Sequence, residues 1–382
     1  MMLLIVGLFV SPASASSCVG VRVRSGDNLQ LKINARPQGT TFCLEKGTYL
    51  LRQGVLVKSY DRIIGEPGTV LDGQNVVVTG LWGYGGSLGQ KNVVIRGIGL
   101  RNFRGEAISA GWNWLVSRSN IRNSTVGIVI SNGIVLRDNR IHHNRRIGVT
   151  GGPVNGALIE RNQIDHNNTA RNDVGVHAGG AKIIGGSAGS SKLVWRGNWV
   201  HHNIGNGLWM DYNVRNVTLE ENLVEDNTAI GIYYEVSWNG IIRNNAVRNN
   251  ASIYAGKSCF WGSQIHVNNS QNVEIYGNTV RSTDGANGIC AVDIDRTATA
   301  PASTKVADLY VHDNVVRMRL SSHTGLVGRA ASYGATANNR FVDNTYYVTA
   351  TSRRHWDWST YPVAWSTWRD YGNDTPGKLL TW

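Results

Sequence analysis

Acidic residues at matching places in two segments are the part of this sequence best suited to chemistry. Asp211 lies four residues after Gly207, and Glu235 lies four residues after Gly231. Carboxyl groups held close together raise one another's pKa, so that one can carry a proton while the other is ionised. Such a pair could hydrolyse a glycosidic bond, and a base beside it could remove the proton next to a sugar carboxylate.

A recurring glycine predicts which other side chains share the face of Asp211 and Glu235. The glycines taken to open equivalent strands are Gly127, Gly148, Gly175, Gly207, Gly231 and Gly262. Because side chains alternate along a strand, the second and fourth residues after each glycine should point outward. The catalytic candidates on or beside this face are Lys182, Asp211, Glu235 and His266. The substrate-binding candidates are His177, Trp209, Tyr212, Tyr233 and Gln264.

These residue types have clear uses in carbohydrate chemistry. Trp209 and Tyr233 offer flat apolar faces for sugar rings. Lys182 or His266 could act as general base or acid, or neutralise a uronate carboxylate. Two reaction classes therefore fit. One is proton abstraction at C5 of a uronic acid, which gives elimination or epimerisation, and the other is hydrolysis by the carboxyl pair.

Two columns of asparagine indicate how these side chains are brought together. Where the columns overlap, both advance by 23, 36, 24 and 23 residues, so they mark one repeating coil. The first column comprises Asn139, Asn162, Asn198, Asn222, Asn245, Asn278, Asn314 and Asn344. The second comprises Asn144, Asn167, Asn203, Asn227 and Asn250.

A repeat of this length with several short β-rich runs is typical of a β-solenoid. Asparagine suits its bends because it tolerates left-handed backbone angles, and a stacked amide can donate to one coil and accept from the next. Leucine-rich repeats have a similar period but need a leucine ladder, and leucine is sparse in these coils. We therefore predict an all-β fold, a parallel β-helix.

The sequence outside the repeats suggests an exported protein with a capped solenoid. Residues 1–15 resemble a signal peptide. We expect an N-terminal cap and first coils over 16–60, with a helix within 26–34, the β-helix over 61–348, and a Trp-rich cap over 349–382. Four cysteines allow three pairings, of which we favour Cys18 with Cys43 and Cys259 with Cys290. Insertions near 173–192, 251–261 and 282–308 should rise as walls around the candidate face.

Composition narrows the possible partners. The formal net charge of +12 favours attraction to a polyanion, and for an exported solenoid an acidic polysaccharide is the natural one. We find no nucleic-acid motif, no membrane span and no metal site, and we expect a monomer without a cofactor. The fragment Asp293-Ile294-Asp295 resembles part of a calcium site, but without a glycine-rich calcium repeat we interpret it as structural.

The Asn columns, the capped N-terminus and the exported context resemble the right-handed parallel β-helix superfamily of pectate lyases, polygalacturonases, alginate lyases and mannuronan epimerases. The stretch from Gly175 to Asn250 looks especially like a group of secreted bacterial β-helix repeat proteins, with Gly207 to Asn213 and Gly231 to Trp238 as its motifs. The resemblance extends from Cys18 to the C-terminus and implies action on a polysaccharide. A lyase or epimerase on a uronic-acid polymer is our first hypothesis, a glycoside hydrolase the second, and a carbohydrate-binding or surface protein without activity the third.

Overall fold

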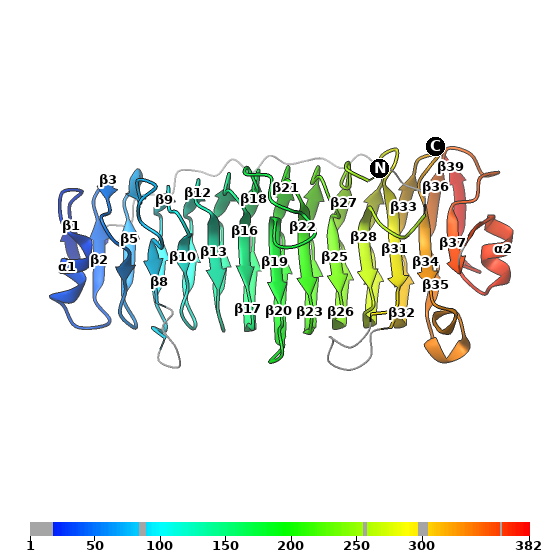
Figure 1. Cartoon of the computed structure of the whole chain (residues 1–382), viewed down its shortest axis with the longest axis horizontal. Coiled ribbons are helices and arrows are strands. Elements are labelled where there is room, and N and C mark those ends of the chain that lie inside the picture. The colour runs from blue at the N-terminus through cyan, green and yellow to red at the C-terminus, as the bar shows by residue number, and fades with distance from the viewer. Residues whose placement is uncertain (1–17, 84–88, 255–257, 297–304, 360) are drawn as a thin grey trace.

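The computed structural model describes residues 18–83, 89–254, 258–296, 305–359 and 361–382, which form a rod of stacked coils (Figure 1). Within this part of the chain the strands form three sheets of 13 strands each. Neighbouring strands of a sheet come from successive coils and pair in parallel almost throughout. The predicted parallel β-helix is therefore confirmed.

Each coil passes through sheets 1, 2 and 3 in turn. Sheet 1 contains β1 (Val21–Val23), β2 (Thr41–Leu44), β5 (Arg62–Gly65), β8 (Val94–Arg96), β11 (Leu115–Ser117), β14 (Val135–Arg137), β17 (Asn155–Glu160), β20 (Ser190–Arg196), β23 (Val214–Glu220), β26 (Trp238–Arg243), β29 (Gln271–Tyr276), β32 (Ala307–His312) and β35 (Arg340–Val342). Sheet 2 contains β3 (Gly47–Leu50), β6 (Thr69–Asp72), β9 (Gly99–Arg101), β12 (Asn120–Arg122), β15 (Arg140–His142), β18 (Gln163–Asp165), β21 (Trp199–His201), β24 (Leu223–Glu225), β27 (Ala246–Arg248), β30 (Thr279–Arg281), β33 (Val315–Met318), β36 (Thr345–Val348) and β39 (Lys378–Thr381). Sheet 3 contains β4 (Val55–Leu56), β7 (Leu81–Trp82), β10 (Glu106–Ser109), β13 (Val126–Ile130), β16 (Ile147–Gly151), β19 (Gly179–Ile184), β22 (Asn206–Asp211), β25 (Ile232–Glu235), β28 (Ser263–Asn268), β31 (Asn287–Asp293), β34 (Thr324–Gly328), β37 (Trp356–Ser359) and β38 (Tyr361–Val363).

The two asparagine columns form the predicted ladders, one at each of two bends. In the first ladder, between sheets 1 and 2, Asn222 Nδ2 donates to Trp195 O (2.9 Å) and to Asn245 Oδ1 (3.0 Å). The same contacts repeat from coil to coil and satisfy amides that are almost fully buried. One reason that we gave for asparagine is wrong, because the left-handed residue is the one before it, such as Glu221 with a φ of 58°.

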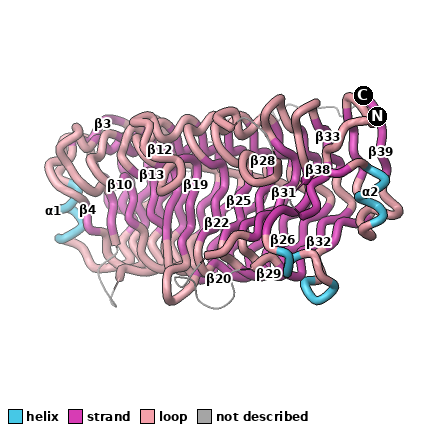
Figure 2. Tube along the Cα trace, turned by 45° about the vertical axis from the view of Figure 1, so that its right-hand side comes forward, coloured by secondary structure: helices cyan, strands magenta, loops and turns pink. Residues whose placement is uncertain are grey.

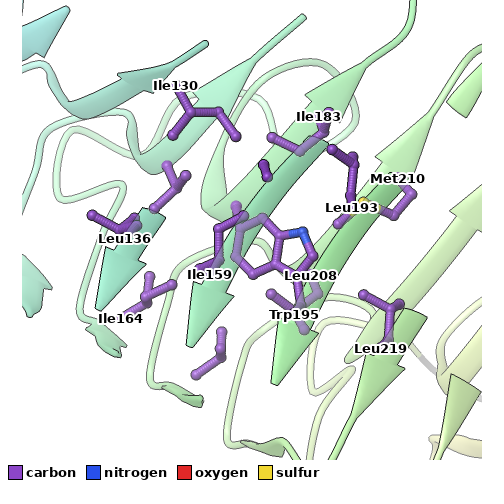
Figure 3. Packing of buried hydrophobic residues seen from close by; sticks show 14 of the residues in the cluster. Ile130, Leu136, Ile159, Ile164, Ile183, Leu193, Trp195, Leu208, Met210 and Leu219 are labelled. Atoms are coloured by element: carbon purple, nitrogen blue, oxygen red, sulfur yellow. The ribbon is translucent and has the colours of Figure 1, made fainter. Parts of the chain in front are cut away.

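Apolar side chains from all three sheets fill the interior. Figure 3 shows Ile159 and Trp195 of sheet 1 side by side in the interior near Leu208 of sheet 3, and each is fully buried. Burying one large aliphatic side chain stabilises a fold by roughly 1.5–3 kcal/mol. A single coil cannot cover these residues alone, so the stacked coils hold each other's strands in register.

Short helices lie at the two ends of the rod (Figure 2). The predicted N-terminal helix is α1 (Leu29–Asn34), which buries Leu29 and Ile33 beside the first coils. Near the C-terminus, β37 pairs in parallel with β34, β38 returns antiparallel to β37, and β39 pairs with β36. Helix α2 (Trp365–Asp370) packs there with Trp368 buried. The turns η1 (Ala330–Ser332) and η2 (Ala335–Ala337) precede β35.

Two disulfides join Cys18 to Cys43 and Cys259 to Cys290, as predicted. Such bonds are typical of proteins that fold in an oxidising compartment. The predicted signal peptide, 1–15, lies outside the described residues. In the part of the chain that the structure describes, no helix has both the length and the apolar character needed to cross a membrane.

Candidate functional site

Strand pairing in sheet 3 fixes which candidate side chains share a row. The adjacent strands β19, β22, β25 and β28 lie side by side in the middle of the rod (Figure 1). One row along them consists of Lys182, Trp209, Tyr233 and His266. Two residues further along the same strands, Asp211 is paired with Glu235, and Glu235 with Asn268.

The row differs from the predicted one in two coils. Lys182 occupies the position predicted for His177, and His266 the position predicted for Gln264. The glycine of this coil that belongs to the column is Gly180 rather than Gly175. Position 180 requires a glycine, because a Cβ there would lie 3.1 Å from Asn203 Nδ2 of the second asparagine ladder. Gly175 precedes the strand of its coil.

Gln264 was predicted to face outward, and this is wrong. Its side chain is fully buried, and Oε1 accepts from both Asn250 N and Asn250 Nδ2 at 3.0 Å. Gln264 thus stands where the glycine column continues and ends the second asparagine ladder. The coil after Asn250 has no asparagine in the second column, and the longer side chain of Gln264 supplies the amide oxygen in its place.

Lys182 connects both rows. Its Nζ lies 2.9 Å from Asp211 Oδ2, donates to Val176 O at 2.6 Å and lies 3.3 Å from the centre of the Trp209 ring. The side chain is only 5% exposed. With its donors engaged inside the protein, Lys182 is placed to hold Asp211 and Trp209 rather than to take a proton from a substrate.

Glu235 is the buried member of the carboxyl pair. Trp209 Nε1 donates to its Oε2 at 3.0 Å, and Arg296 forms an ion pair with its Oε1. Burial and the neighbouring Asp211 raise the pKa of Glu235 from its usual value, against the opposing effects of Arg296 and a hydrogen bond from Tyr233. The environment of the pair therefore allows one carboxyl group to keep its proton to a higher pH than usual.

His266 lies beneath the surface and does not reach it. Its ring stacks on Trp261 at 5.5 Å and is fully buried, while Nδ1 lies 3.0 Å from Ser263 Oγ. Burial and the charge of Arg296 lower the pKa of His266 to about 3. Because the ring is neutral at ordinary pH and covered, the general acid or base role that we considered for His266 does not fit this geometry.

The described parts of the predicted insertions contact the row, whereas 255–257 and 297–304 lie outside the described residues. Val176 contacts Lys182, Tyr254 packs on the Trp209 and Tyr233 rings, and Arg296 contacts Glu235. The Cys259–Cys290 disulfide ties the middle insertion to β31 beside the half-exposed Phe260 and Trp261.

The exposed groups around the row are few. Among the residues that the structure describes, they are the side chains of His177, Asp211 (18% exposed) and Arg296 (29%), next to the Phe260 and Trp261 rings. Partial burial and the charges of Lys182 and Arg146 lower the pKa of His177. Tyr212 follows β22 with a left-handed backbone and is half-buried.

Arg296, Phe260 and Trp261 were missed as site residues. They lie on insertions, which carry no repeat from which their direction could be predicted. The one available signal was Cys259, because its predicted disulfide with Cys290 joins the segment that carries Phe260 and Trp261 to the repeat region. Asp293, in the calcium-like fragment, accepts hydrogen bonds from Asn269 and Arg329 and is thus held by protein donors.

A second feature is a basic groove in the first coils, along the bend between sheets 1 and 2. Its volume is about 890 Å³. Arg22 is paired with Glu66, and Arg101 with Asp72, which leaves the groove with an excess of positive charge. The basic residues that line it are Arg22, Lys46, Arg96, Arg101, Arg118 and Arg122.

Comparison with known proteins identifies the fold. The family described as the right-handed β-helix region matches residues 105–264, and the family described as the periplasmic copper-binding protein NosD matches residues 186–365. No curated protein matches the chain.

Similar solved structures include the mannuronan C-5 epimerase AlgE6 A-module of Azotobacter vinelandii, with 17% identity, a TM-score of 0.64, and 92% of this chain and 94% of that chain covered. The catalytic unit of a GH87 α-1,3-glucanase from Streptomyces thermodiastaticus has 13% identity and a TM-score of 0.57, covering 97% and 69%. The surface protein and adhesin PfbA of Streptococcus pneumoniae has 11% identity and a TM-score of 0.52, covering 95% and 96%. The chain is a right-handed parallel β-helix protein.

Proposed function

We propose that this chain is an exported enzyme that acts on a polysaccharide containing uronic acid, as a lyase or an epimerase. The observation that carries the proposal is the pairing of the partly exposed Asp211 with the buried Glu235 on adjacent coils, between two cations. Removing a proton next to a carboxylate requires a base and positive charge near that carboxylate. The cluster supplies both.

The exposure of each group suggests its role. Asp211 is the more exposed carboxyl group, so we assign proton abstraction to it. Arg296 could bind the sugar carboxylate through its planar guanidinium. The raised pKa of Glu235 suits a group that returns a proton to the sugar. Trp261, at the rim, offers a flat face for a neighbouring sugar ring.

Three further observations support an acidic polymer outside the cytoplasm. The net charge of +12 and the basic groove favour a polyanion. The disulfides and the apolar N-terminal run favour export. A protein of similar fold is named as a mannuronan C-5 epimerase, and mannuronan is a polymer of a uronic acid.

Product analysis tests the proposal. The purified chain is incubated with uronate polymers and with neutral polysaccharides, and the ultraviolet absorbance of unsaturated uronate is followed together with reducing ends. Elimination raises both, hydrolysis raises reducing ends alone, and epimerisation is detected as deuterium uptake at C5 in heavy water. Reducing ends without unsaturated product would favour hydrolysis by Asp211 and Glu235. No product and no exchange with any uronate polymer would contradict the proposal.

A second candidate function is binding of an acidic polysaccharide without turnover, and the basic groove favours it. Its test is retention of the chain on immobilised uronate polymer at rising salt concentration. If binding takes place in the groove, Arg118→Ala together with Arg122→Ala lowers the salt concentration needed for elution. Arg369→Ala, at the far end of the rod, and Asp211→Asn then elute as the unmodified chain does. Equal elution of all variants would contradict the groove as the binding surface.

A further inference from the structure

Three pairs of side chains that include histidine lie at the end of strands of sheet 2, outside the candidate site. They directly precede the second asparagine column, as His142-His143, Asp165-His166 and His201-His202. The first member of each pair ends a strand, and the second has a left-handed backbone with a φ of 52° or 53°. Adjacent side chains normally point to opposite faces of a strand, but the left-handed residue turns the chain so that both members of a pair meet.

The His142-His143 pair brings two ring nitrogens together. The Nδ1 atoms of the two rings are 2.8 Å apart. Two imidazole nitrogens at this distance must share a proton or another cation, because two lone pairs would repel each other. His142 Nε2 lies 3.0 Å from Asn120 Oδ1 on the preceding coil, and an amide oxygen only accepts hydrogen bonds. Nε2 of His142 therefore carries the hydrogen, and its Nδ1 presents a lone pair to His143.

A carboxylate on the next coil completes the cluster. Asp165 is paired with His142 across the parallel strands β15 and β18 and is fully buried. Arg140 and His166 both donate to it, so its orientation is fixed and part of its charge is shared. One ligand atom from each of His142, His143 and Asp165 lies within 4.8 Å of the other two.

We propose that His142, His143 and Asp165 bind a divalent transition-metal ion such as Zn²⁺ or Cu²⁺. Neutral imidazole nitrogens with one carboxylate oxygen are a ligand set that these ions prefer, whereas Ca²⁺ and Mg²⁺ prefer oxygen alone. The hydrogen bond from His142 to Asn120 is the support that metal-binding histidines typically have on the other ring nitrogen. The ion takes the place of the proton between the two Nδ1 atoms.

The His201-His202 pair serves as an internal comparison. Its Nδ1 atoms are 2.9 Å apart, but His201 Nε2 lies 3.1 Å from Gln163 Nε2, a donor. His201 therefore accepts at Nε2 and carries its hydrogen on Nδ1, where it is directed at His202. In this tautomer His201 presents no lone pair to His202, and within the described residues no third ligand atom joins the two rings within 4.8 Å as Asp165 joins His142 and His143. The pair that resembles the proposed site most should therefore not bind the ion.

The test is a calorimetric titration of the full chain, purified without a histidine tag and freed of metal with a chelator, with Zn²⁺. We expect one ion per chain and a rise in the unfolding temperature with Zn²⁺ concentration. His143→Gln should weaken binding by at least about tenfold, and Asn120→Leu by about 10–100-fold, because His142 loses its support. His202→Gln should bind as the unmodified chain does.

Unchanged Zn²⁺ binding in both His143→Gln and Asn120→Leu would overturn the assignment. So would a loss of Zn²⁺ affinity in His202→Gln as large as that in His143→Gln. Both His143 and Asn120 are exposed, so neither substitution should affect folding. Matching circular dichroism and unfolding temperatures of the metal-free variants check this. Cu²⁺ in the same titration should bind more tightly than Zn²⁺, as expected for imidazole ligands.

Discussion

Acid should destabilise this protein through the imidazole of His266. Burial and the charge of Arg296 lower the pKa of this ring from 6.5 to about 3. The unfolded chain gains a proton there as the pH falls below 6.5, whereas the folded chain gains it only near pH 3. The folded-state pKa is the lower one, so stability that is fully present above pH 6.5 is lost progressively as the pH falls toward 3.

The size of this loss follows from the two pKa values. Each pH unit between them changes the free energy of unfolding by about 1.4 kcal/mol. At pH 4, which is roughly 2.5 units below 6.5, the His266 ring should make the free energy of unfolding about 3 kcal/mol lower than at pH 7. Domains are typically stable by only about 5–15 kcal/mol, so the loss should be measurable.

Urea unfolding at pH 7 and pH 4 measures this loss. His266→Asn removes the titrating ring and keeps a polar atom near Ser263, so the unmodified chain should lose about 3 kcal/mol more than this variant. His177→Asn is the comparison variant: the pKa of the His177 ring is lowered too, but the ring is exposed and loses less solvation, so its removal should reduce the acid-induced loss by less than His266→Asn does. Equal losses in the unmodified chain and His266→Asn would refute the reasoning. So would an NMR titration of the unmodified chain in which the His266 ring gains its proton between pH 6 and 7.

Two further predictions concern stability. Asn222→Ala removes the Oδ1 that accepts from the buried Asn198 N and Nδ2 and the Nδ2 that donates to Trp195 O, and it should lower the free energy of unfolding in urea by roughly 2–5 kcal/mol. Asn155→Ala, which loses an exposed contact with Ser191, should cost less than about 1 kcal/mol, and equal costs would contradict the importance of the buried ladder. Replacing Cys259 and Cys290 with Ser should lower stability by about 2–4 kcal/mol and make Trp261 more accessible to a fluorescence quencher. Unchanged quenching would show that the disulfide does not hold the rim.

The fold was predictable because its signal repeats. The asparagine columns mark two bends of every coil, and buried amides leave little freedom in what can replace them, as Asn222 illustrates. The pairing of Trp209 with Tyr233 and of Asp211 with Glu235 could be predicted, because the two coils that carry them have nearly equal length. Where coils carry insertions, the nearest glycine no longer marks the strand, which is why His177 and Gln264 were placed on the row in error.

Contacts made by the insertions could not be predicted in the same way. Arg296 reaches Glu235 from a segment with no repeat, so no spacing in the sequence links the two residues. The burial of His266 depends on Trp261, which is likewise on an insertion. The histidine pairs of sheet 2 did leave a signal, because His142-His143 and His201-His202 precede the second asparagine column at the same offset. Their convergence depends on the left-handed residue, which became clear only from the structure.

The most direct test of the proposed site is turnover of a uronate polymer by Asp211→Asn and Glu235→Gln. The matched controls are Asp226→Asn and Glu221→Gln, which both lie in the coil of Glu235 but on bends outside sheet 3. If Asp211 and Glu235 carry the chemistry, each substitution should lower kcat by at least about a hundredfold, the loss typical of removing an acid or base, while both controls keep full activity. Full activity in Asp211→Asn or Glu235→Gln would contradict the assignment of the reaction to this pair.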